Sequence, residues 1–352
     1  MPEFYDIAIV GTGPAGTVFA WELAKKRRDM RILLINGQTE DRSKPCGGLL
    51  APDAQKVLAQ FDLTLPKSIL ADPQIFSVET IDLVTEHVKY YQRHYLNMDR
   101  YAFDMWLLSL VPDSVRVVNG RCIKIRKIEE LFELTLGAGM VVRAAAVVGA
   151  DGASSVVRKT FFKPMSKQYV SIQQWFLHAG QTLPYYSCIF DPKTSDSCSW
   201  TIHKDGYVIF GGAFDKQGCR KAFEEQKKRF EEFANNKFGE PVKTEACLVS
   251  SPRRLSDFVC SKPGVYLIGE AAGFISSSSF EGISSALISA KRLSDAFAEG
   301  KDHKQISRAY KNKTRKLRFK LWTKTFKRCV LCSPFLRRLI MKSGIESIEK
   351  ES

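Results

Sequence analysis

A glycine-rich turn between a strand pattern and a helix pattern opens the chain and most constrains its fold. Residues 4–10 are rich in apolar, strand-forming side chains and run directly into Gly11–Gly16, which reads G-x-G-x-x-G. A helical pattern covers residues 14–28, and residues 30–35 give a second apolar strand. This order predicts a β-α-β unit with a dinucleotide-binding turn after its first strand.

The residues of this turn have separate tasks in such a site. Gly11 permits the tight turn, Gly13 lets the backbone approach a pyrophosphate, and Gly16 lets the helix pack against the strand. Pro14 and Ala15 begin the helix, whose N-terminal N–H groups and positive dipole end favour a phosphate. We therefore expect these five residues to contact the cofactor.

Position 36 departs from the usual pattern of dinucleotide-binding sites. An acidic residue about 20 positions beyond the glycines normally binds a ribose hydroxyl, but the residue directly after the second strand pattern is Asn36. An amide also forms a hydrogen bond to a hydroxyl, although without the assistance of a charge. Asn36 remains our expected ribose contact.

The length and the cysteine content narrow the class of protein. A chain of 352 residues accommodates two domains, and no run of 18 or more apolar residues is present. The first strand pattern begins at Phe4, so we expect no secretory leader. Nine cysteines, an odd number without a regular framework, favour a reduced, cytoplasmic protein. Cys329 and Cys332 form a C-x-x-C without a second pair, and we predict no metal site.

Positive charge is concentrated at the C-terminus. Residues 301–352 contain 16 lysines and arginines against four acidic residues, whereas the whole chain carries a net charge of +15. The rest of the chain is therefore nearly neutral.

The remainder of the chain alternates between strand and helix patterns. Strands are expected at 75–84 and 87–93, followed by a helix at 98–110. Aromatic-rich strand patterns then dominate residues 168–214, with a charged helix at 220–237. Further strand and helix patterns are expected at residues 115–118, 122–128, 131–136, 140–142, 145–150, 264–268 and 281–298.

Two further strand ends carry a glycine beside an acidic residue. They are Asp151-Gly152 and Gly269-Glu270, and a helix pattern follows each. Three such turns in this order resemble the FAD-binding fold shared by flavin hydroxylases and geranylgeranyl reductases. The resemblance implies that Asp151 and Gly152 lie near the pyrophosphate and that Glu270, where the family usually has Asp, binds ribityl or ribose hydroxyls. It also implies that the helix entered at Gly282 and Ile283 faces the flavin, where a positive dipole end favours the anionic reduced form.

Other stretches favour the geranylgeranyl reductases over the hydroxylases. Lys44–Leu49 resembles the Cys-Gly-Gly element of the reductases, and it implies that Cys46, Gly47 and Gly48 contact the flavin. Arg100, with the Phe-Asp-x-Trp that follows it, resembles a further family element and is another expected FAD contact. Residues 200–207 occupy the place of the family's Trp-containing strand pair.

The reacting groups are less well defined by the sequence. Cys46 is either a thiol at the reacting face or a small residue in a glycine loop. His203 is either a proton source or a surface residue at a turn. Trp175, Trp200, Tyr207 and Phe210 either line an apolar substrate channel or belong to a core, because aromatic side chains on strands are often buried.

The basic C-terminal segment has two interpretations. Lysines at 313, 316, 320, 324 and 327 repeat at helical spacing, and an apolar row of Phe319, Trp322, Phe326 and Val330 lies beside them. Such a helix either binds an anionic membrane surface or packs its apolar side on the protein. Nucleic-acid binding is not expected, because no recognition motif accompanies the charge.

The sequence thus predicts an α/β fold with a Rossmann-like FAD-binding domain of the glutathione-reductase and flavin-hydroxylase type. We assign residues 1–74, 97–165 and 251–300 to this domain, 75–96 and 166–250 to an antiparallel-sheet substrate domain, and 301–352 to a basic helical segment. The resemblance implies an FAD-dependent oxidoreductase that reduces C=C bonds of an isoprenoid or polyprenyl lipid, with NAD(P)H or a carrier protein as electron donor. The alternatives are an FAD-dependent monooxygenase of a hydrophobic substrate and a non-catalytic flavin-bearing lipid-binding protein.

Overall fold

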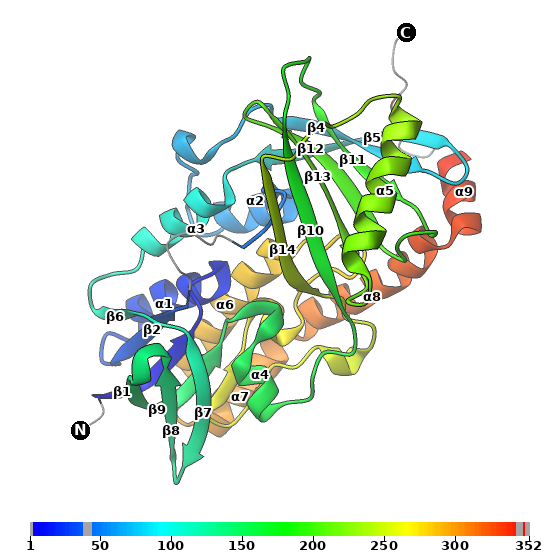
Figure 1. Cartoon of the computed structure of the whole chain (residues 1–352). Helices are drawn as coiled ribbons and strands as arrows, with labels where there is room; N and C mark the ends of the chain where they lie inside the picture. The colour runs from blue at the N-terminus through cyan, green and yellow to red at the C-terminus, as the bar shows by residue number, and fades with distance from the viewer. Residues whose placement is uncertain (1–2, 38–43, 343–347, 349–352) are drawn as a thin grey trace. The chain divides into compact units, whose positions relative to one another are not determined.

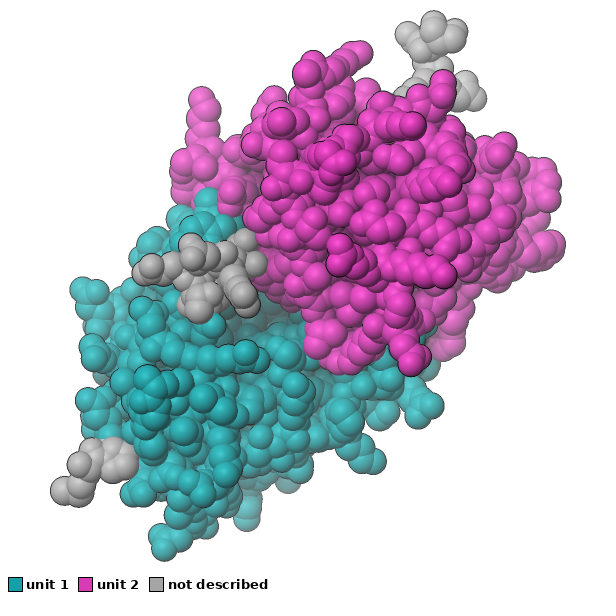
Figure 2. Space-filling model, viewed as in Figure 1, with its two compact units in different colours: residues 1–43, 101–167, 250–323 teal, residues 44–100, 168–249, 324–352 magenta. Residues whose placement is uncertain are grey.

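The computed structural model describes residues 3–37, 44–342 and 348 (Figure 1). The chain forms two compact units, which Figure 2 shows in different colours. Unit 1 comprises residues 1–43, 101–167 and 250–323, and unit 2 comprises residues 44–100, 168–249 and 324–352. These limits differ from our domain assignment chiefly at residues 44–74, which belong to unit 2, and in the C-terminal segment, which is divided after residue 323.

A largely parallel sheet forms the centre of unit 1. β1 lies between β2 and β9 and is parallel to both, with Ile7 opposite Ile32 on one side and Ala146 on the other. β6 extends the sheet beyond β2, and β16 extends it beyond β9, both in parallel. The strands are β1 (Glu3–Val10), β2 (Ile32–Asn36), β6 (Val115–Asn119), β7 (Cys122–Ile128), β8 (Leu131–Leu136), β9 (Val141–Gly149), β15 (Ser261–Lys262) and β16 (Val265–Leu267).

The helices of unit 1 follow the strands of this sheet. α1 packs against α6, and both begin at an uncapped glycine, Gly13 for α1 and Gly282 for α6. After α6 the chain continues through α7 into α8. Unit 1 ends at Thr323, so the C-terminal part of α8 belongs to unit 2. The helices are α1 (Pro14–Lys26), α3 (Arg100–Ser109), α4 (Val156–Phe161), α6 (Ile283–Glu299), α7 (His303–Lys313) and α8 (Arg315–Cys332), with 3₁₀ turns η2 (Gly137–Gly139), η3 (Gly152–Ser154), η4 (Leu255–Asp257) and η5 (Gly269–Ala272).

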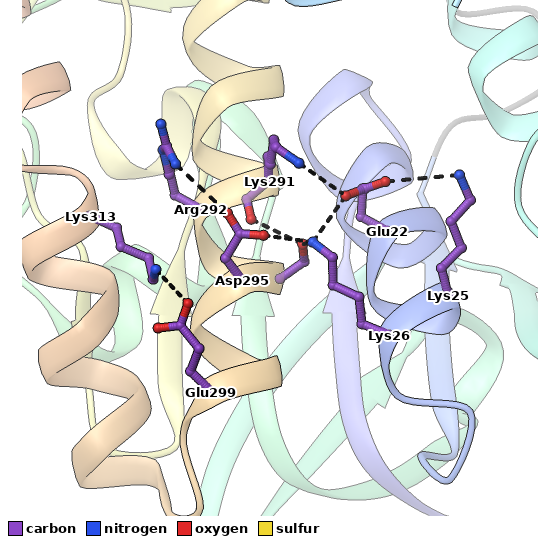
Figure 3. A network of polar contacts seen from close by, with 9 residues as sticks. Glu22, Lys25, Lys26, Lys291, Arg292, Asp295, Glu299 and Lys313 are labelled. Atoms are coloured by element: carbon purple, nitrogen blue, oxygen red, sulfur yellow. Dashed lines mark hydrogen bonds and ion pairs between the residues drawn. The ribbon is translucent and has the colours of Figure 1, made fainter. Parts of the chain in front are cut away.

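A network of ion pairs joins α1 to α6, and a separate pair, Lys313 with Glu299, joins α7 to α6 (Figure 3). Lys26 lies between two carboxylates, with its Nζ 3.1 Å from Glu22 and 2.7 Å from Asp295. Lys291 also approaches Glu22, at 3.7 Å, and the Glu22 side chain is buried. These contacts hold the C-terminal halves of α1 and α6 together, so they help to set where the two uncapped N-termini lie.

A second sheet, of mixed type, forms unit 2. Its order is β14-β10-β13-β12-β11-β4-β5-β3. The pairs are antiparallel where the register is described, except that β4 and β11 run parallel, so the expected antiparallel sheet contains one parallel pair. The strands are β3 (Leu49–Leu50), β4 (Ile75–Asp82), β5 (His87–Asn97), β10 (Gln168–Leu177), β11 (Tyr185–Phe190), β12 (Cys198–Lys204), β13 (Tyr207–Phe214) and β14 (Lys243–Ser250).

The two faces of this sheet carry different groups of side chains. On one face, α5 (Cys219–Ala234) packs over β10 and β13 and buries a phenylalanine-rich core (Figure 1). On the other, β4 and β5 contribute to a smaller cluster around Val78 and Tyr95. The remaining helices of unit 2 are α2 (Pro52–Ala59), η1 (Lys67–Ile69) and α9 (Pro334–Lys342).

The C-terminal helices bury a different row of side chains from the one expected. On α8 the buried residues are Leu317, Leu321, Thr325 and Arg328, whereas Phe319 and Phe326 are exposed. Trp322 and Val330, the other members of the expected row, are half-buried, so only part of this row packs on the protein. The helix presents part of that row to the surface because the adjacent row of the same helix is buried instead.

Candidate functional site

Three glycine-rich turns meet at one edge of the parallel sheet of unit 1. They follow β1, β9 and β16, which are neighbours in that sheet. A Cβ on Gly11 would lie 2.7 Å from the carbonyl oxygen of Ala150, and a Cβ on Gly269 would lie 2.9 Å from the Cβ of Ala15. The first turn therefore contacts both the second and the third. Open α/β sheets bind ligands at this edge, beyond the carboxyl ends of their strands.

The glycines of the first turn differ in the space around them. Gly11 has a φ of +108°, and a Cβ on Gly16 would lie 1.9 Å from the carbonyl oxygen of Gly11, so neither position accepts a side chain. A Cβ on Gly13 would meet no atom within 4 Å. No side chain caps α1, and no acidic residue lies in its first turn. Open space therefore lies beside the N-terminus of α1, and no acidic side chain of the protein neutralises that end of the helix. Both conditions favour the binding of a phosphate.

The amide of Asn36 is held at the end of β2. Its Oδ1 accepts a hydrogen bond from the Thr12 hydroxyl at 2.7 Å, and its Nδ2 donates to Asn119 at 3.0 Å. Thr17 in turn donates to the carbonyl of Thr12. The contacts link Asn36 directly to the glycine turn, and its role as a ribose contact stays a prediction.

The second turn contains a carboxylate with one unpaired oxygen. Asp151 Oδ2 accepts a hydrogen bond from the backbone N–H of Val156 at 2.6 Å, whereas its Oδ1 is buried without a hydrogen-bond partner among the described residues. Burial raises the pKa of Asp151. Gly152 follows with a φ of +66°. A ligand hydroxyl or N–H at Oδ1 would satisfy the unpaired oxygen.

The third turn, at Gly269–Ala272, is stabilised by hydrogen bonds that the sequence did not predict. Glu270 Oε1 accepts the backbone N–H of Ser250 at 2.8 Å. The buried Arg158 donates to the carbonyls of Ala271 and Asp257, which ties the segment after Asp151 to η5. Within the described part of unit 1, three buried hydroxyls lack a hydrogen-bond partner, those of Ser250, Ser251 and Ser277. Buried polar atoms are normally paired, so Asp151 Oδ1 and these hydroxyls leave hydrogen-bonding capacity for a polar ligand.

The loop that contains Cys46, Gly47 and Gly48 lies beside a buried lysine in unit 2. Lys204 Nζ donates to the carbonyl of Met98 at 2.6 Å, and a Cβ on Gly48 would lie 2.1 Å from that nitrogen. Burial lowers the pKa of Lys204 to about 8. Cys46 Sγ lies 3.4 Å from the backbone nitrogen of Gly48, which donates to it. The structure thus places an amine of lowered pKa beside the cysteine loop.

Three of the predicted pocket residues share one face of the sheet in unit 2. Trp200 pairs with Gly211, and a Cβ on Gly211 would lie 2.5 Å from the indole Nε1. That Nε1 is buried without a hydrogen-bond partner among the described residues. Trp175 lies on the same face, packs edge-on against Tyr207 and donates its N–H to Glu245 at 2.9 Å. Lys204 also faces this side, because it lies four residues after Trp200 on β12 and residues an even number apart on a strand share a face.

Phe210 and His203 lie on the opposite face. Phe210 is fully buried in the core beneath α5, beside Phe223 and Phe230, so it does not line a pocket on the face of Trp200. His203 is also buried, which makes the expected surface position wrong. Burial lowers the pKa of His203 to about 4, so the imidazole is neutral near pH 7.

Arg100 and the cysteines complete the predicted set. Arg100 begins α3 and is half-buried, and its role as an FAD contact stays a prediction. Cys329 is exposed and Cys332 half-buried, and both are free thiols. Residues 3–37, 44–342 and 348 contain no group of three His, Cys, Asp or Glu side chains that could hold a metal ion. Over the same residues, no helix has the length and apolar character needed to cross a membrane.

Comparison of the sequence identifies the relatives of this chain. A CbrA protein of Escherichia coli is 45% identical over 355 residues, which cover 98% of this chain and 98% of the relative. The family model described as "Lycopene cyclase protein" matches residues 6–211.

Comparison of the structure gives the same fold in more distant proteins. A geranylgeranyl bacteriochlorophyll reductase-like protein from Thermoplasma acidophilum superposes with a TM-score of 0.80 at 18% identity, over 97% of this chain and 91% of the other. A probable FAD-dependent monooxygenase from Pseudomonas aeruginosa superposes with a TM-score of 0.71 at 15% identity, over 96% and 98%. The sequence matches decide the family: this chain belongs to the CbrA family, within the wider group that the lycopene cyclase model describes.

Proposed function

We propose that this protein is an FAD-dependent oxidoreductase that reduces C=C bonds of an isoprenoid or polyprenyl lipid. The observation that carries the proposal is the site in unit 1, where three turns converge on the uncapped N-terminus of α1. Open space at Gly13 and the unpaired Asp151 Oδ1 accompany it. These features suit a dinucleotide with a pyrophosphate and several hydroxyls. The fold shared with a probable FAD-dependent monooxygenase supports FAD as that dinucleotide and a FAD domain of the glutathione-reductase and flavin-hydroxylase type.

The residues of unit 1 would hold FAD by distinct contacts. The backbone of Gly11–Gly16 would bind the pyrophosphate, Asp151 and Gly152 would lie beside it, and Asn36 and Glu270 would accept or donate hydrogen bonds at ribose or ribityl hydroxyls. The uncapped start of α6, at Gly282 and Ile283, would place a positive dipole end near the ring. FAD, once bound and reduced, supplies the hydride for the reduction.

The names of the relatives support an isoprenoid as the substrate. One is a geranylgeranyl bacteriochlorophyll reductase-like protein, and the family model is named for a cyclase of lycopene. Geranylgeranyl groups and lycopene are both isoprenoid chains. In unit 2, Trp175, Trp200 and Tyr207 offer an apolar face for such a chain, and the unpaired Trp200 Nε1 offers one donor to a polar group of the substrate.

The proton that completes the reduction would come from the cysteine loop. Cys46 and Lys204 are the candidates, because Lys204 is partly protonated near pH 8 and lies beside Gly48. His203 fits this role poorly, since it is neutral at pH 7 and lies on the other face of the sheet. NAD(P)H or a carrier protein would return the electrons to the cofactor. We propose a cytoplasmic location at the inner face of the membrane, where such a lipid is found.

A monooxygenase is the second candidate, because two of the structurally similar proteins are a probable FAD-dependent monooxygenase and p-nitrophenol 4-monooxygenase. Such an enzyme would insert an oxygen atom from air into a hydrophobic substrate. A third candidate is a flavin-bearing protein that binds a lipid without turnover.

One experiment separates these functions. The purified protein is reduced without oxygen and mixed with a panel of polyprenyl lipids, and the cofactor absorbance and product masses are followed. We expect reoxidation by a lipid and a product that has gained two hydrogen atoms. A product that gains oxygen only after air is admitted would establish the monooxygenase instead. If the protein binds FAD but changes no lipid under either condition, the binding protein becomes the better interpretation.

A further inference from the structure

Helix α9 buries an arginine and exposes a group of apolar side chains. Arg337 is buried at the centre of the helix, whereas Phe335, Leu336 and Leu339 are 71%, 39% and 54% exposed. An ordinary surface helix of a globular protein has the reverse arrangement. Among the residues that the structure describes, the packing of unit 2 therefore does not account for the apolar face of α9.

Specific contacts fix this orientation. The Arg337 guanidinium forms a buried ion pair with Asp82 at the end of β4, at 2.8 Å, and its Nη1 donates to the carbonyl of Leu331 at 2.6 Å. It also lies over the ring of Phe190, 4.7 Å from the centroid. Lys89 on β5 donates to the carbonyl of Ile340 near the end of the helix. A rotation that buried Phe335 would break the Arg337 contacts.

The exposed face combines apolar and cationic side chains. Phe335, Leu336 and Leu339 stand at positions i, i+1 and i+4, so they lie on one side of the helix. Arg338 and Lys342 are exposed at the flank of that face. The arrangement is that of an interfacial amphipathic helix, in which aromatic and aliphatic side chains enter the acyl boundary and basic side chains meet the headgroups.

The positive charge of the segment that contains α9 favours an anionic partner. Residues 303–345 contain 14 lysines and arginines and no aspartate or glutamate. A second copy of this chain seated on the same face would bring two such basic segments together, and like charges oppose that contact. An anionic bilayer offers the opposite charge together with an apolar interior.

We propose that the face of α9 formed by Phe335, Leu336 and Leu339, flanked by Arg338 and Lys342, inserts into the surface of an anionic phospholipid bilayer. The inference gives the proposed membrane location a specific contact surface, and it does not depend on the proposed reaction, because it needs neither a reduced cofactor nor a prenyl substrate. The occupant is the lipid surface itself rather than one bound lipid molecule.

Sedimentation with vesicles tests this surface directly. The full chain is mixed with vesicles of phosphatidylcholine alone or of phosphatidylcholine with phosphatidylglycerol, all without prenyl lipid. We expect binding to the anionic vesicles, weakened by salt, and a loss of at least tenfold in affinity for F335S/L339S. The matched control is I123S/I128S on β7, where the side chains are similarly exposed, at 61% and 42%. This control should bind as the unchanged protein does.

Two further measurements keep the test decisive. Circular dichroism must show that F335S/L339S is folded. If it is not, Phe335→Trp in anionic vesicles with brominated acyl chains should show fluorescence quenching above that of the unchanged protein. Equal vesicle binding by F335S/L339S and the unchanged protein, or no added quenching at position 335, would overturn the proposal. So would a dimer of the unchanged protein that F335S/L339S converts to a monomer.

Discussion

The guanidinium of Arg337 lies 2.8 Å from the carboxylate of Asp82, and both side chains are buried. The other oxygen of Asp82 accepts the backbone N–H groups of Val84 and Thr85. The pair therefore joins α9 to the turn after β4, across 255 residues of sequence.

Removing one partner of this pair should destabilise the protein strongly. Arg337→Met leaves a buried carboxylate without its cation, and we expect a loss of about 3–5 kcal/mol in the free energy of unfolding. The double variant D82N/R337M should lose less than the sum of the two single changes, because it leaves no uncompensated charge. Urea unfolding of the four proteins measures both effects. An Arg337→Met variant as stable as the unchanged protein would show that the pair does not anchor α9.

The space at Gly13 gives a test of the pyrophosphate position. Gly13→Ala should leave stability nearly unchanged, because a Cβ there meets no protein atom within 4 Å. The same Cβ would occupy the space that we assign to the pyrophosphate, so the affinity for FAD should fall at least tenfold, by about 1.4 kcal/mol or more. Titration of the apoprotein with FAD, beside a thermal unfolding curve, checks both results. Unchanged FAD affinity would place the pyrophosphate elsewhere.

Gly48 should tolerate no side chain. A Cβ at this position, where φ is +67°, would lie 2.1 Å from Lys204 Nζ and 2.2 Å from the carbonyl oxygen of Met98. We expect Gly48→Ala to destabilise the protein by about 3 kcal/mol. Gly218 is the control, because its φ is similar, at +71°, but a Cβ there meets nothing within 4 Å. Gly218→Ala should cost only about 1 kcal/mol in chemical unfolding, and equal losses would contradict the crowding at Gly48.

Lys204 should make stability depend on pH in the alkaline range. Burial lowers its pKa from 10.5 to about 8 in the folded protein, so between these values the unfolded chain binds more protons. Stability rises with pH under that condition, and this group should contribute a rise of about 2 kcal/mol between pH 8 and pH 10. Unfolding curves of the unchanged protein and of Lys204→Met, compared at both pH values, isolate the effect. The prediction fails if the difference in stability between the two proteins is the same at both pH values.

Local backbone requirements explain what the sequence predicted well. The strand before Gly11, the helix that begins at Pro14 and the second strand all appear close to where they were expected. Only their ends differ: β2 begins two residues later and ends one residue later than predicted, and α1 ends two residues earlier. Glycine positions and apolar periodicity are visible in a single segment. The turns at Gly11, Asp151 and Gly269 could therefore be found, and the sheet order places them together.

The alternation of side chains along β13 already separates two of the predicted pocket residues. Tyr207 and Phe210 lie an odd number of residues apart on β13, so they point to opposite faces and cannot line one pocket. Burial of charged residues was harder to foresee. Lys204, Arg158 and Arg337 are buried because of partners such as Met98, Ala271 and Asp82, which are distant in sequence. For the same reason, apolar spacing alone could not show which row of α8 would be buried.

The most direct test of the central claim is a single turnover in heavy water without oxygen. The reduced protein is mixed with a polyprenyl lipid in D₂O, and the product is analysed by mass spectrometry. Because the hydride and the proton both pass through groups that exchange with solvent, reduction of a C=C bond should place two deuterium atoms on adjacent carbons of the product. A lipid recovered without added deuterium, or a product that carries one deuterium and no net gain of hydrogen, would contradict the reductase.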